Sequence, residues 1–387
     1  GHGALAVSTG ASNTAVGKYA LVANTTGNAN VAVGNVSLDA NTSGERNTAI
    51  GAEALGHNTT ASANTAVGYK ALFTNTTGTT NVAVGQDALR YNTTASNNTA
   101  VGLSALKANI TGAENTALGT NALKDNTTGT SNTAVGYAAL QNLTTGGSNV
   151  ALGFQALRDS TTGSSNIAIG QNALVYNSSG ANNVGVGQNA CFNTTTGTTN
   201  VGIGSNALLS NTTGDRNVAV GFNSLDACTT GALNTGVGAD SLSALTTGGY
   251  NVAVGDDALG AVTTPNRNTG IGLAAGREIT TGAFNTAVGS AAMGGATAIT
   301  GSANIAIGSW QDGVIEGPLG ALSSGNSNVA MGNGALRALT TGAQNVAIGH
   351  GCGNNIIVGD TNTFIGYNIV IGNTATDATV AIGSNFT

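Results

Sequence analysis

The sequence predicts an all-β fold, a parallel β-solenoid or β-roll of about 22 coils that stack on one another. A short motif recurs on a strict period of 17 residues. The composition is rich in glycine and poor in charge. A turn of Asn, Thr and Gly separates each motif from the next, as expected where a chain reverses direction between short strands.

The repeated motif is Asn, a small or β-branched residue, Ala or Gly, an aliphatic residue and Gly. It begins at Asn13 and recurs every 17 residues up to Asn285. The next two steps lengthen to 19 residues at Asn304 and 24 at Asn328, after which the 17-residue step returns. The full unit reads N-[TV]-[AG]-[VIL]-G-x-x-A-L-x-x-N-T-T-G-x-x. This period is too short for helical or leucine-rich repeats, so each unit is predicted to form one coil.

The repeat spacings divide the chain into regular coils over residues 1–303, an irregular coil with an inserted loop over 304–327, and terminal coils over 328–387. Coils about 4.8 Å apart predict a rod on the order of 100 Å long. Residue 1 falls in mid-coil, and an open coil edge invites aggregation. We therefore expect a segment of a longer fibre, or an edge that another subunit covers.

Composition excludes several classes of protein. Glycine provides 60 of 387 residues, while 7% of residues are charged and 4% are aromatic, which is unlike an ordinary globular enzyme. The 40% hydrophobic content argues against disorder, and the net charge of −6 includes no basic patch for nucleic acid. No apolar stretch is long enough to insert in a membrane. Three cysteines at irregular spacing predict neither a disulfide framework nor a metal site.

Within a coil we number the positions from the first asparagine of the motif, so that Asn64 is position 1 and Thr80 is position 17. Alternation along a strand places Thr65 and Val67 on one face and Ala66 on the other. We expect the Val67 face to form the core and the Ala66 face to lie outside, where three chains pack their small residues together. Gly68 is expected to need a positive φ or a close backbone approach.

The rest of the coil is predicted to hold a second strand and a turn. Ala71-Leu72 forms the second short strand, with Leu72 closing the core from the other side. Residues 75–78 form the turn, in which Gly78 supplies the left-handed conformation. Stacked asparagines are expected to form hydrogen-bonded ladders along the axis.

These repeats resemble two families of fibrous proteins. The strands resemble those of the β-roll heads of trimeric autotransporter adhesins. The full unit, such as residues 132–146, more closely resembles the shaft repeats of bacteriophage tail fibres. The resemblance covers almost the whole chain and implies a homotrimer, intertwined or side by side. It implies the structural shaft of an extracellular fibre that takes part in host attachment, joined to other fibre or tail proteins at its ends and located in a virion tail or on a cell surface.

Two other functions remain open at this point. A bacterial surface adhesin or extracellular filament would bind through its long face of Thr and Asn. An ice-binding solenoid is suggested by the repeated Thr76-Thr77 pair, although adjacent threonines point to opposite faces. No enzyme activity and no cofactor or metal is expected, because the histidines are scattered and Asp256-Asp257 reads as a solvated turn.

The inserted loop of the 24-residue step is the best candidate for a contact site. It contains the single Trp of the chain and two carboxylates. Trp310, Gln311, Asp312 and Glu316 fit contact with a cell-surface glycan or protein, and the alternative is a loop that only closes a bend.

Overall fold

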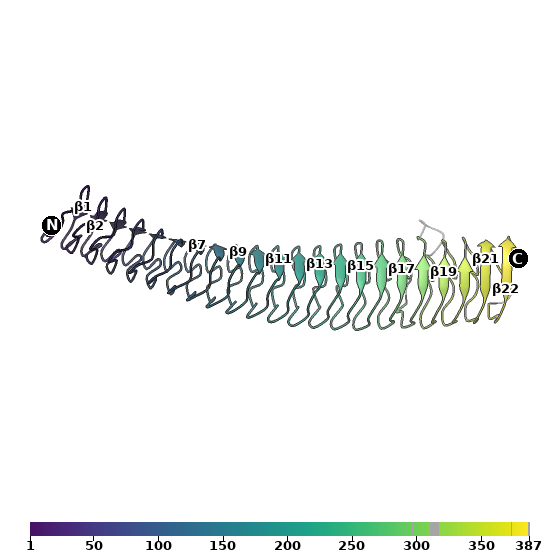
Figure 1. The fold of residues 1–387 in the computed structure, drawn as a ribbon. Coiled ribbons are helices and arrows are strands. Elements are labelled where there is room, and N and C mark those ends of the chain that lie inside the picture. The colour runs from purple at the N-terminus through teal and green to yellow at the C-terminus, as the bar shows by residue number, and fades with distance from the viewer. Residues whose placement is uncertain (296, 310–316, 373, 386–387) are drawn as a thin grey trace. The chain divides into compact units, whose positions relative to one another are not determined.

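The computed structural model describes residues 1–295, 297–309, 317–372 and 374–385. These form two compact units, Gly1–Thr196 and Gly197–Thr387, which are described separately. Each unit is an all-β parallel solenoid in which the strands of successive coils lie side by side (Figure 1). The predicted fold class is confirmed, and the described residues contain no helix.

Each coil contributes one short strand. The strands of the first unit are β1 (Thr14–Val16), β2 (Val31–Val33), β3 (Thr48–Ile50), β4 (Thr65–Val67), β5 (Val82–Val84), β6 (Thr99–Val101), β7 (Thr116–Leu118), β8 (Thr133–Val135), β9 (Val150–Leu152), β10 (Ile167–Ile169) and β11 (Val184–Val186). Those of the second unit are β12 (Val201–Ile203), β13 (Val218–Val220), β14 (Thr235–Val237), β15 (Val252–Val254), β16 (Thr269–Ile271), β17 (Thr286–Val288), β18 (Ile305–Ile307), β19 (Val329–Met331), β20 (Val346–Ile348), β21 (Thr363–Tyr367) and β22 (Val380–Ser384).

Equivalent positions pair between neighbouring strands. In the first unit Ala134 of β8 lies opposite Ala151 of β9. The same register holds across the two long steps of the second unit, where Ala306 of β18 pairs with Ala287 on one side and Ala330 on the other. The parallel register of the sheet is therefore maintained across both long steps.

The predicted inner and outer faces of the strand are reversed. Ala66 is fully buried, as is Asn64, whereas Thr65 and Val67 are only partly buried. The same pattern holds at equivalent positions in both units, so the aliphatic residue of position 4 faces outward. The Ala and Gly column therefore belongs to the core and is not an outer surface on which three chains pack.

Where position 9 is Leu, the coil leaves little room for a side chain at position 3 of the next coil. A Cβ added to Gly270, at position 3, would lie 2.8 Å from Cγ of Leu259, the buried position 9 of the preceding coil. Phe364 is a buried exception. The preceding coil has Gly353 at position 9 in place of Leu, and a Cβ there would meet the Phe364 ring at 2.6 Å. The side chains at position 9 of one coil and position 3 of the next therefore fill the same part of the core, and a large residue at one position requires a small residue at the other.

The predicted second strand is wrong, although Leu72 does close the core. Lys70 and Leu72 have φ values of 56° and 51°, so the chain turns where an extended strand was expected. Its amides still bond to both neighbouring coils: Leu72 N–H donates to Ala88 O at 2.9 Å and Lys70 N–H donates to Ala52 O at 3.1 Å. Hydrogen bonds between coils therefore satisfy this backbone without a regular strand.

Glycine recurs at positions 5 and 15 of the coil, and only position 5 requires a positive φ. Gly68, at position 5, has a φ of +135°, and an added Cβ would meet Gly85 O at 2.6 Å. The expected positive φ and the expected close backbone approach are therefore both present. The prediction for Gly78 is wrong, because position 15 lies outside the left-handed region. Ala61 and Pro265 occupy this same position in other coils, which confirms that no positive φ is required there.

A ladder of buried asparagines runs along position 1 of each unit, as predicted. Asn64 N–H donates to Oδ1 of Asn47 at 3.0 Å, and Asn64 Nδ2 donates to Gly78 O at 2.8 Å. The ladder continues through the long steps of the second unit, where Asn328 N–H donates to Oδ1 of Asn304 at 3.0 Å. Each side chain thereby joins two coils and also holds the turn of its own coil.

A second asparagine ladder occupies position 12 in the first unit. Asn92 Nδ2 donates to Oδ1 of Asn75 at 2.9 Å, and the same bond links seven successive coils, at residues 24, 41, 58, 75, 92, 109 and 126. Leu143 follows, so Oδ1 of Asn126 is buried without a hydrogen-bond partner. In the second unit this column becomes apolar from Cys228 onward, with Leu245, Val262 and Ile279 fully buried.

We expect Asn92→Leu to lower the free energy of unfolding by about 1–3 kcal/mol more than Asn126→Leu does. The first substitution leaves Oδ1 of Asn75 as a second unpaired buried acceptor. The second only transfers the existing unpaired acceptor to Asn109. Chemical denaturation of the two variants measures the difference, and equal losses would contradict this account of the ladder.

The narrow core predicts opposite outcomes for two neighbouring substitutions. Ala134→Val adds two methyl groups at buried position 3 and should cost roughly 1–3 kcal/mol through overpacking. Thr133→Val alters the partly buried position 2, which Val already occupies in β9, and should change stability by less than about 0.5 kcal/mol. Thermal denaturation followed by circular dichroism compares them, and a stable Ala134→Val protein would refute the narrow core.

Candidate functional surfaces

The predicted contact residues Trp310, Gln311, Asp312 and Glu316 lie outside the described residues, so that prediction stays a prediction. The flanks of their segment are described. Ser309 N–H donates to Oδ1 of Asn333 at 3.1 Å, and Pro318 O accepts from Met293 N–H at 3.1 Å. Both flanks are therefore hydrogen-bonded to neighbouring coils of the second unit.

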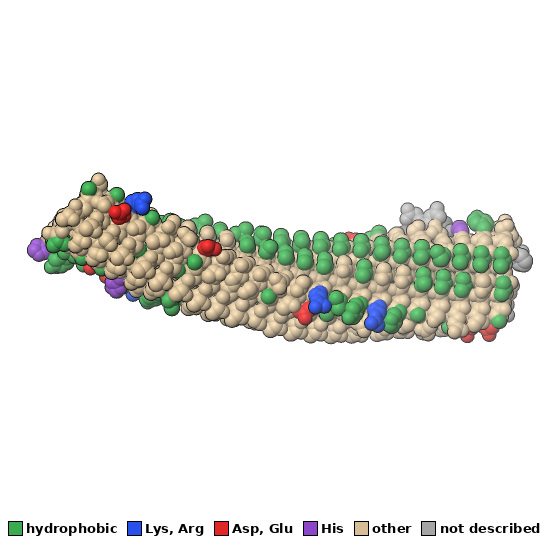
Figure 2. All heavy atoms as spheres, in the orientation of Figure 1, with side chains coloured by type: hydrophobic (Ala, Val, Ile, Leu, Met, Phe, Trp, Pro, Cys, Tyr) green, Lys and Arg blue, Asp and Glu red, His purple; other side chains and the backbone are tan. Residues whose placement is uncertain are grey.

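The outer face of the strands exposes aliphatic side chains in each unit, and we call it the outer sheet face (positions 2 and 4). In the first unit it exposes Ile50 and Leu118, at 41% and 47%. In the second unit Figure 2 shows rows of hydrophobic side chains along successive strands. These include Ile203, Val237, Val252, Val254, Ile271, Ile305, Ile307, Met331, Ile348 and Ile365. Position 4 therefore forms a column of exposed or partly exposed aliphatic side chains along the strands of each unit.

Two exposed columns flank the outer sheet face. Position 17 precedes the strand and position 6 follows it. In most coils position 17 is small or polar, but in the second unit Leu233, Tyr250, Arg267 and Phe284 follow one another there. Arg267 lies 5.3 Å from the ring centroids of both Tyr250 and Phe284, which are 55% and 54% exposed. On the other side, position 6 exposes Phe222 and Leu273 at 53% and 57%.

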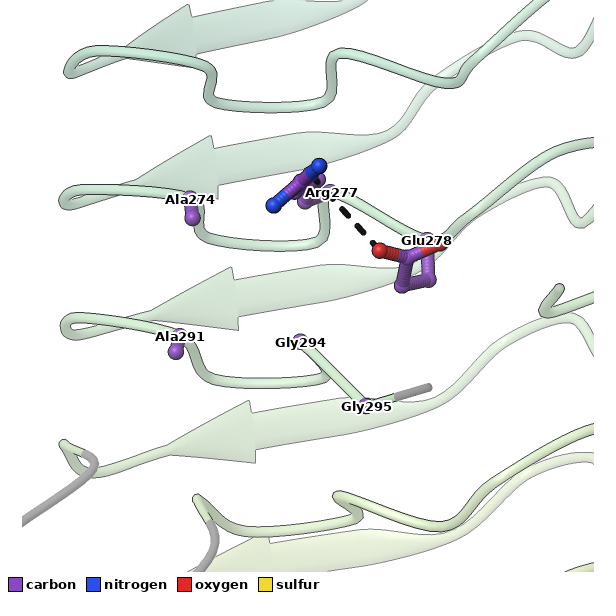
Figure 3. Close-up of a pocket in the computed structure, with 6 residues that line it drawn as sticks. All are labelled: Ala274, Arg277, Glu278, Ala291, Gly294 and Gly295. Carbon is purple, nitrogen blue, oxygen red and sulfur yellow. Dashed lines mark ion pairs between the residues drawn. The ribbon is translucent and has the colours of Figure 1, made fainter. Parts of the chain in front are cut away.

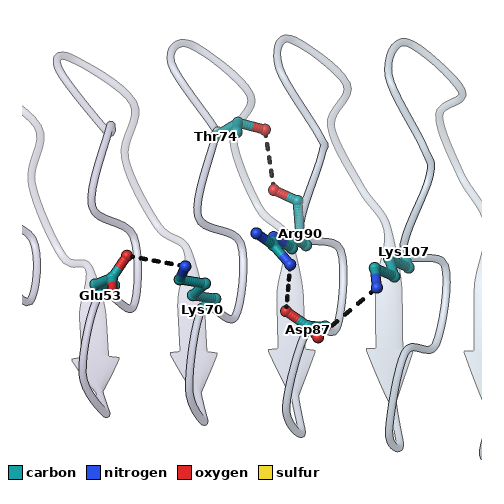
Figure 4. Close-up of polar contacts among 6 residues, drawn as sticks. All are labelled: Glu53, Lys70, Thr74, Asp87, Arg90 and Lys107. Atoms are coloured by element: carbon teal, nitrogen blue, oxygen red, sulfur yellow. Dashed lines mark hydrogen bonds and ion pairs between the residues drawn. The ribbon is translucent and has the colours of Figure 1, made fainter.

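Charged side chains in the first unit pair between coils (Figure 4). Lys70 lies 3.4 Å from Glu53 in the preceding coil. Asp87 contacts Arg90 of its own coil at 3.2 Å and Lys107 of the next coil at 3.8 Å. The stacking therefore brings opposite charges of neighbouring coils together here.

A shallow hollow of about 250 Å³ lies in the second unit (Figure 3). Its lining residues are Ala274, Arg277, Glu278, Ala291, Gly294 and Gly295. Arg277 Nε is already engaged, at 2.9 Å from Asp257 and 3.6 Å from Glu278. Small and apolar residues complete the lining, so the hollow offers little beyond this ion pair with which to orient a ligand.

Titratable groups do not converge on a reactive centre in the part of the chain that the structure describes, and no three metal-binding side chains cluster there. Partial burial raises the pKa of Asp257, although Arg277 acts in the opposite direction. The three histidines each pack against an aromatic ring, those of Tyr19, Phe73 and Tyr367. Burial raises the pKa of the Cys228 thiol to about 11.

The threonines of the turn differ in exposure, as their alternation predicts. Thr76 at position 13 is partly buried, and its hydroxyl donates to Thr93 O at 3.0 Å. Thr77 at position 14 is exposed. In this coil the position 14 threonine is therefore the exposed one, while the hydroxyl of position 13 bonds to the next coil.

These features define a repeat protein of the parallel β-solenoid class, with an apolar outer sheet face and no assembled reactive centre among the residues described. Comparison of the sequence with models of known protein families finds no match, and comparison with curated proteins finds none either. No helix in the described ranges is long and apolar enough to cross a membrane.

The Cys228 thiol should resist alkylation in the folded protein. Its pKa of about 11, against an ordinary value of 9.0, reduces the thiolate fraction at pH 8 by about a hundredfold, and burial slows the reaction further. Mass spectrometry after iodoacetamide treatment, with and without denaturant, measures this protection. Because the folded state holds the proton more tightly, the contribution of this group to stability is complete below pH 9 and is lost as the pH rises toward 11.

Proposed function

We propose that this protein is the structural shaft of a trimeric extracellular fibre, of the kind found in bacteriophage tail fibres that take part in host attachment. The observation that supports this proposal is the outer sheet face. Its aliphatic side chains recur in coil after coil, for example at Val252, Val254 and Ile271, which are 36–41% exposed. Water contact along such a surface is unfavourable, at roughly 25 cal/mol per Å² of apolar area.

The period of this face favours a second copy of the chain as its partner. A surface that repeats every 17 residues is matched along its length only by a surface with the same rise per coil. The chain itself has that surface. Parallel copies that turn their outer sheet faces toward a common axis bury these columns in every coil, and closed cyclic symmetry limits the assembly to a defined number of subunits.

A shaft needs resistance to bending and unfolding more than it needs a reactive site. The two buried asparagine positions, the hydroxyl of position 13 and the backbone amides all form hydrogen bonds between coils. Such a shaft transmits contact at its tip to other fibre or tail proteins at its ends. The segment 310–316 remains a candidate for contact with a cell-surface glycan or protein.

Light scattering tests the assembly. The wild-type protein should have three times the chain mass of 37.4 kDa. Val254→Lys combined with Ile271→Lys places charges on the outer sheet face and should yield monomers. Thr247→Lys combined with Thr264→Lys, at the exposed position 14, is the matched control and should remain trimeric. A folded wild-type protein with the mass of a single chain would overturn the proposal.

A further inference from the structure

Position 17 carries an unusual run of side chains in the second unit. Five successive coils have a large, exposed residue there, and we call the set the position 17 ridge: Arg216, Leu233, Tyr250, Arg267 and Phe284. In the regular coils before the ridge, from residue 29 onward, the same position holds Ala, Ser, Thr or Asn, except at Arg46 and Glu114. The ridge is therefore a local departure from the pattern of the array.

The backbone of the coil gives no reason for these side chains. Leu233, Tyr250 and Phe284 have φ values of 61°, 62° and 62°, in the left-handed region that disfavours bulky residues. Leu72 has a similar φ, but it is fully buried in the core. Tyr250 and Phe284 are 55% and 54% exposed, so core packing does not offset the strain. Strained residues of this kind are typical of ligand contacts.

The ridge also holds two unpaired cations. The guanidinium of Arg267 lies 5.3 Å from the ring centroids of both Tyr250 and Phe284. Neither Arg267 nor Arg216 forms an ion pair among the described residues. The two rings restrict the Arg267 side chain without neutralising its charge, so less rotamer freedom is lost when an anion binds.

The neighbouring carboxylate does not neutralise Arg216. Oδ1 of Asp215 accepts from the N–H and the hydroxyl of Thr198, at 2.6 Å and 2.9 Å. Arg216 and Arg267 lie three coils apart, which is about 14 Å at about 4.8 Å per coil. An elongated ligand along the axis could therefore place an anionic group on each arginine.

The ridge offers no backbone groups to an added peptide strand. The N–H groups of Tyr250 and Arg267 donate to Ala232 O and Gly249 O, both at 3.1 Å, and that of Phe284 donates to Asn266 O at 3.2 Å. Recognition of a peptide by strand addition needs free main-chain donors and acceptors. The available contacts are therefore those of side chains.

Charge density argues against a nucleic acid. The ridge has two cations in about 14 Å, whereas each strand of a nucleic acid duplex carries a phosphate about every 3.4 Å. The whole chain has a net charge of −6, which opposes a dense polyanion. A ligand with widely spaced carboxylates and apolar surface between them fits better.

We propose that the position 17 ridge binds an acidic oligosaccharide. Guanidinium groups bind carboxylates through two parallel hydrogen bonds, so Arg267 and Arg216 each take one carboxylate. The C–H faces of the intervening sugars pack against the exposed parts of Tyr250, Phe284 and Leu233. This inference concerns a ligand of the shaft and does not depend on the trimer.

Asn266 adds a polar contact beside Arg267. Its Oδ1 accepts from Gly249 N–H at 2.6 Å, which fixes the orientation of the exposed amide. Its Nδ2 forms no hydrogen bond among the described residues and can donate to a sugar hydroxyl.

Titration calorimetry at low ionic strength tests the ligand class with three acidic glycans: polygalacturonate, polysialic acid and hyaluronan. We expect at least one to bind, and neutral dextran and methyl-esterified polygalacturonate not to bind. Binding to none of the three acidic glycans, or equally to dextran, would overturn the inference. Tighter binding of oligothymidylate would identify a surface for single-stranded nucleic acid and would also overturn it.

Arginine variants test the site. Arg267→Ala should weaken binding of the acidic glycan at least about tenfold, because it removes a charge-assisted contact. Arg46→Ala is the matched control, since Arg46 occupies position 17 of the first unit between Ala29 and Ala63. It should leave the affinity unchanged. Equal losses in the two variants would show that binding is not located at the ridge.

Tyr250→Asn separates a binding role from a structural one. Asn tolerates the left-handed φ better than Tyr and already occupies position 17 at Asn97 and Asn182, so the thermal midpoint should stay the same or rise. Affinity for the acidic glycan should fall at least about tenfold. A lower midpoint with unchanged affinity would assign the ring a structural role and contradict the proposed site.

Light scattering on the same variants separates this inference from the proposed function. Arg267→Ala and Tyr250→Asn should keep the wild-type mass. A smaller mass would place the ridge in a subunit interface and overturn the glycan site. A trimer that binds no acidic glycan would leave the shaft in place, whereas a monomer that binds one through Arg267 would overturn the trimeric shaft alone.

Discussion

The structure depends on hydrogen bonds between coils that are independent of a continuous strand. Each coil has one three-residue strand, as in Thr65–Val67, and the remainder of the coil turns. Backbone amides of the turning segment, such as that of Leu72, nevertheless donate to the next coil. The buried Asn64 side chain joins its neighbours in the same direction. The stacking therefore determines which residues each position can accept, because every side chain faces its own equivalents above and below.

This stacking explains the low charge of the chain. Equivalent side chains lie about 4.8 Å apart in adjacent coils, so a charged column would repel itself. Glu53 and Lys70 lie in adjacent coils of one column and form an ion pair instead.

The strand, the asparagine ladders and the closing role of Leu72 were predictable from the sequence, because each depends on a residue type at a fixed period. The inner and outer faces were not assigned correctly. Alternation separates two faces but does not say which one is inside, and the expected second strand implied a wider coil. Lys70 and Leu72 adopt left-handed φ values, although neither residue is a glycine, so the sequence contained no signal of the turn. A usable signal was the restriction of position 3 to Ala or Gly, since a narrow core limits volume more strictly than a surface does.

The position 12 ladder has a consequence for how such an array grows. Within the run from Asn24 to Asn126 each amide is bonded to the next, and only the last acceptor is unpaired. Duplication of a whole coil inside the run adds one bonded amide and no new unpaired group. The run can therefore lengthen during evolution at little energetic cost. Duplication across the boundary at Leu143 would bury another unpaired oxygen, so the boundaries between polar and apolar stretches of this column constrain where the gene can expand.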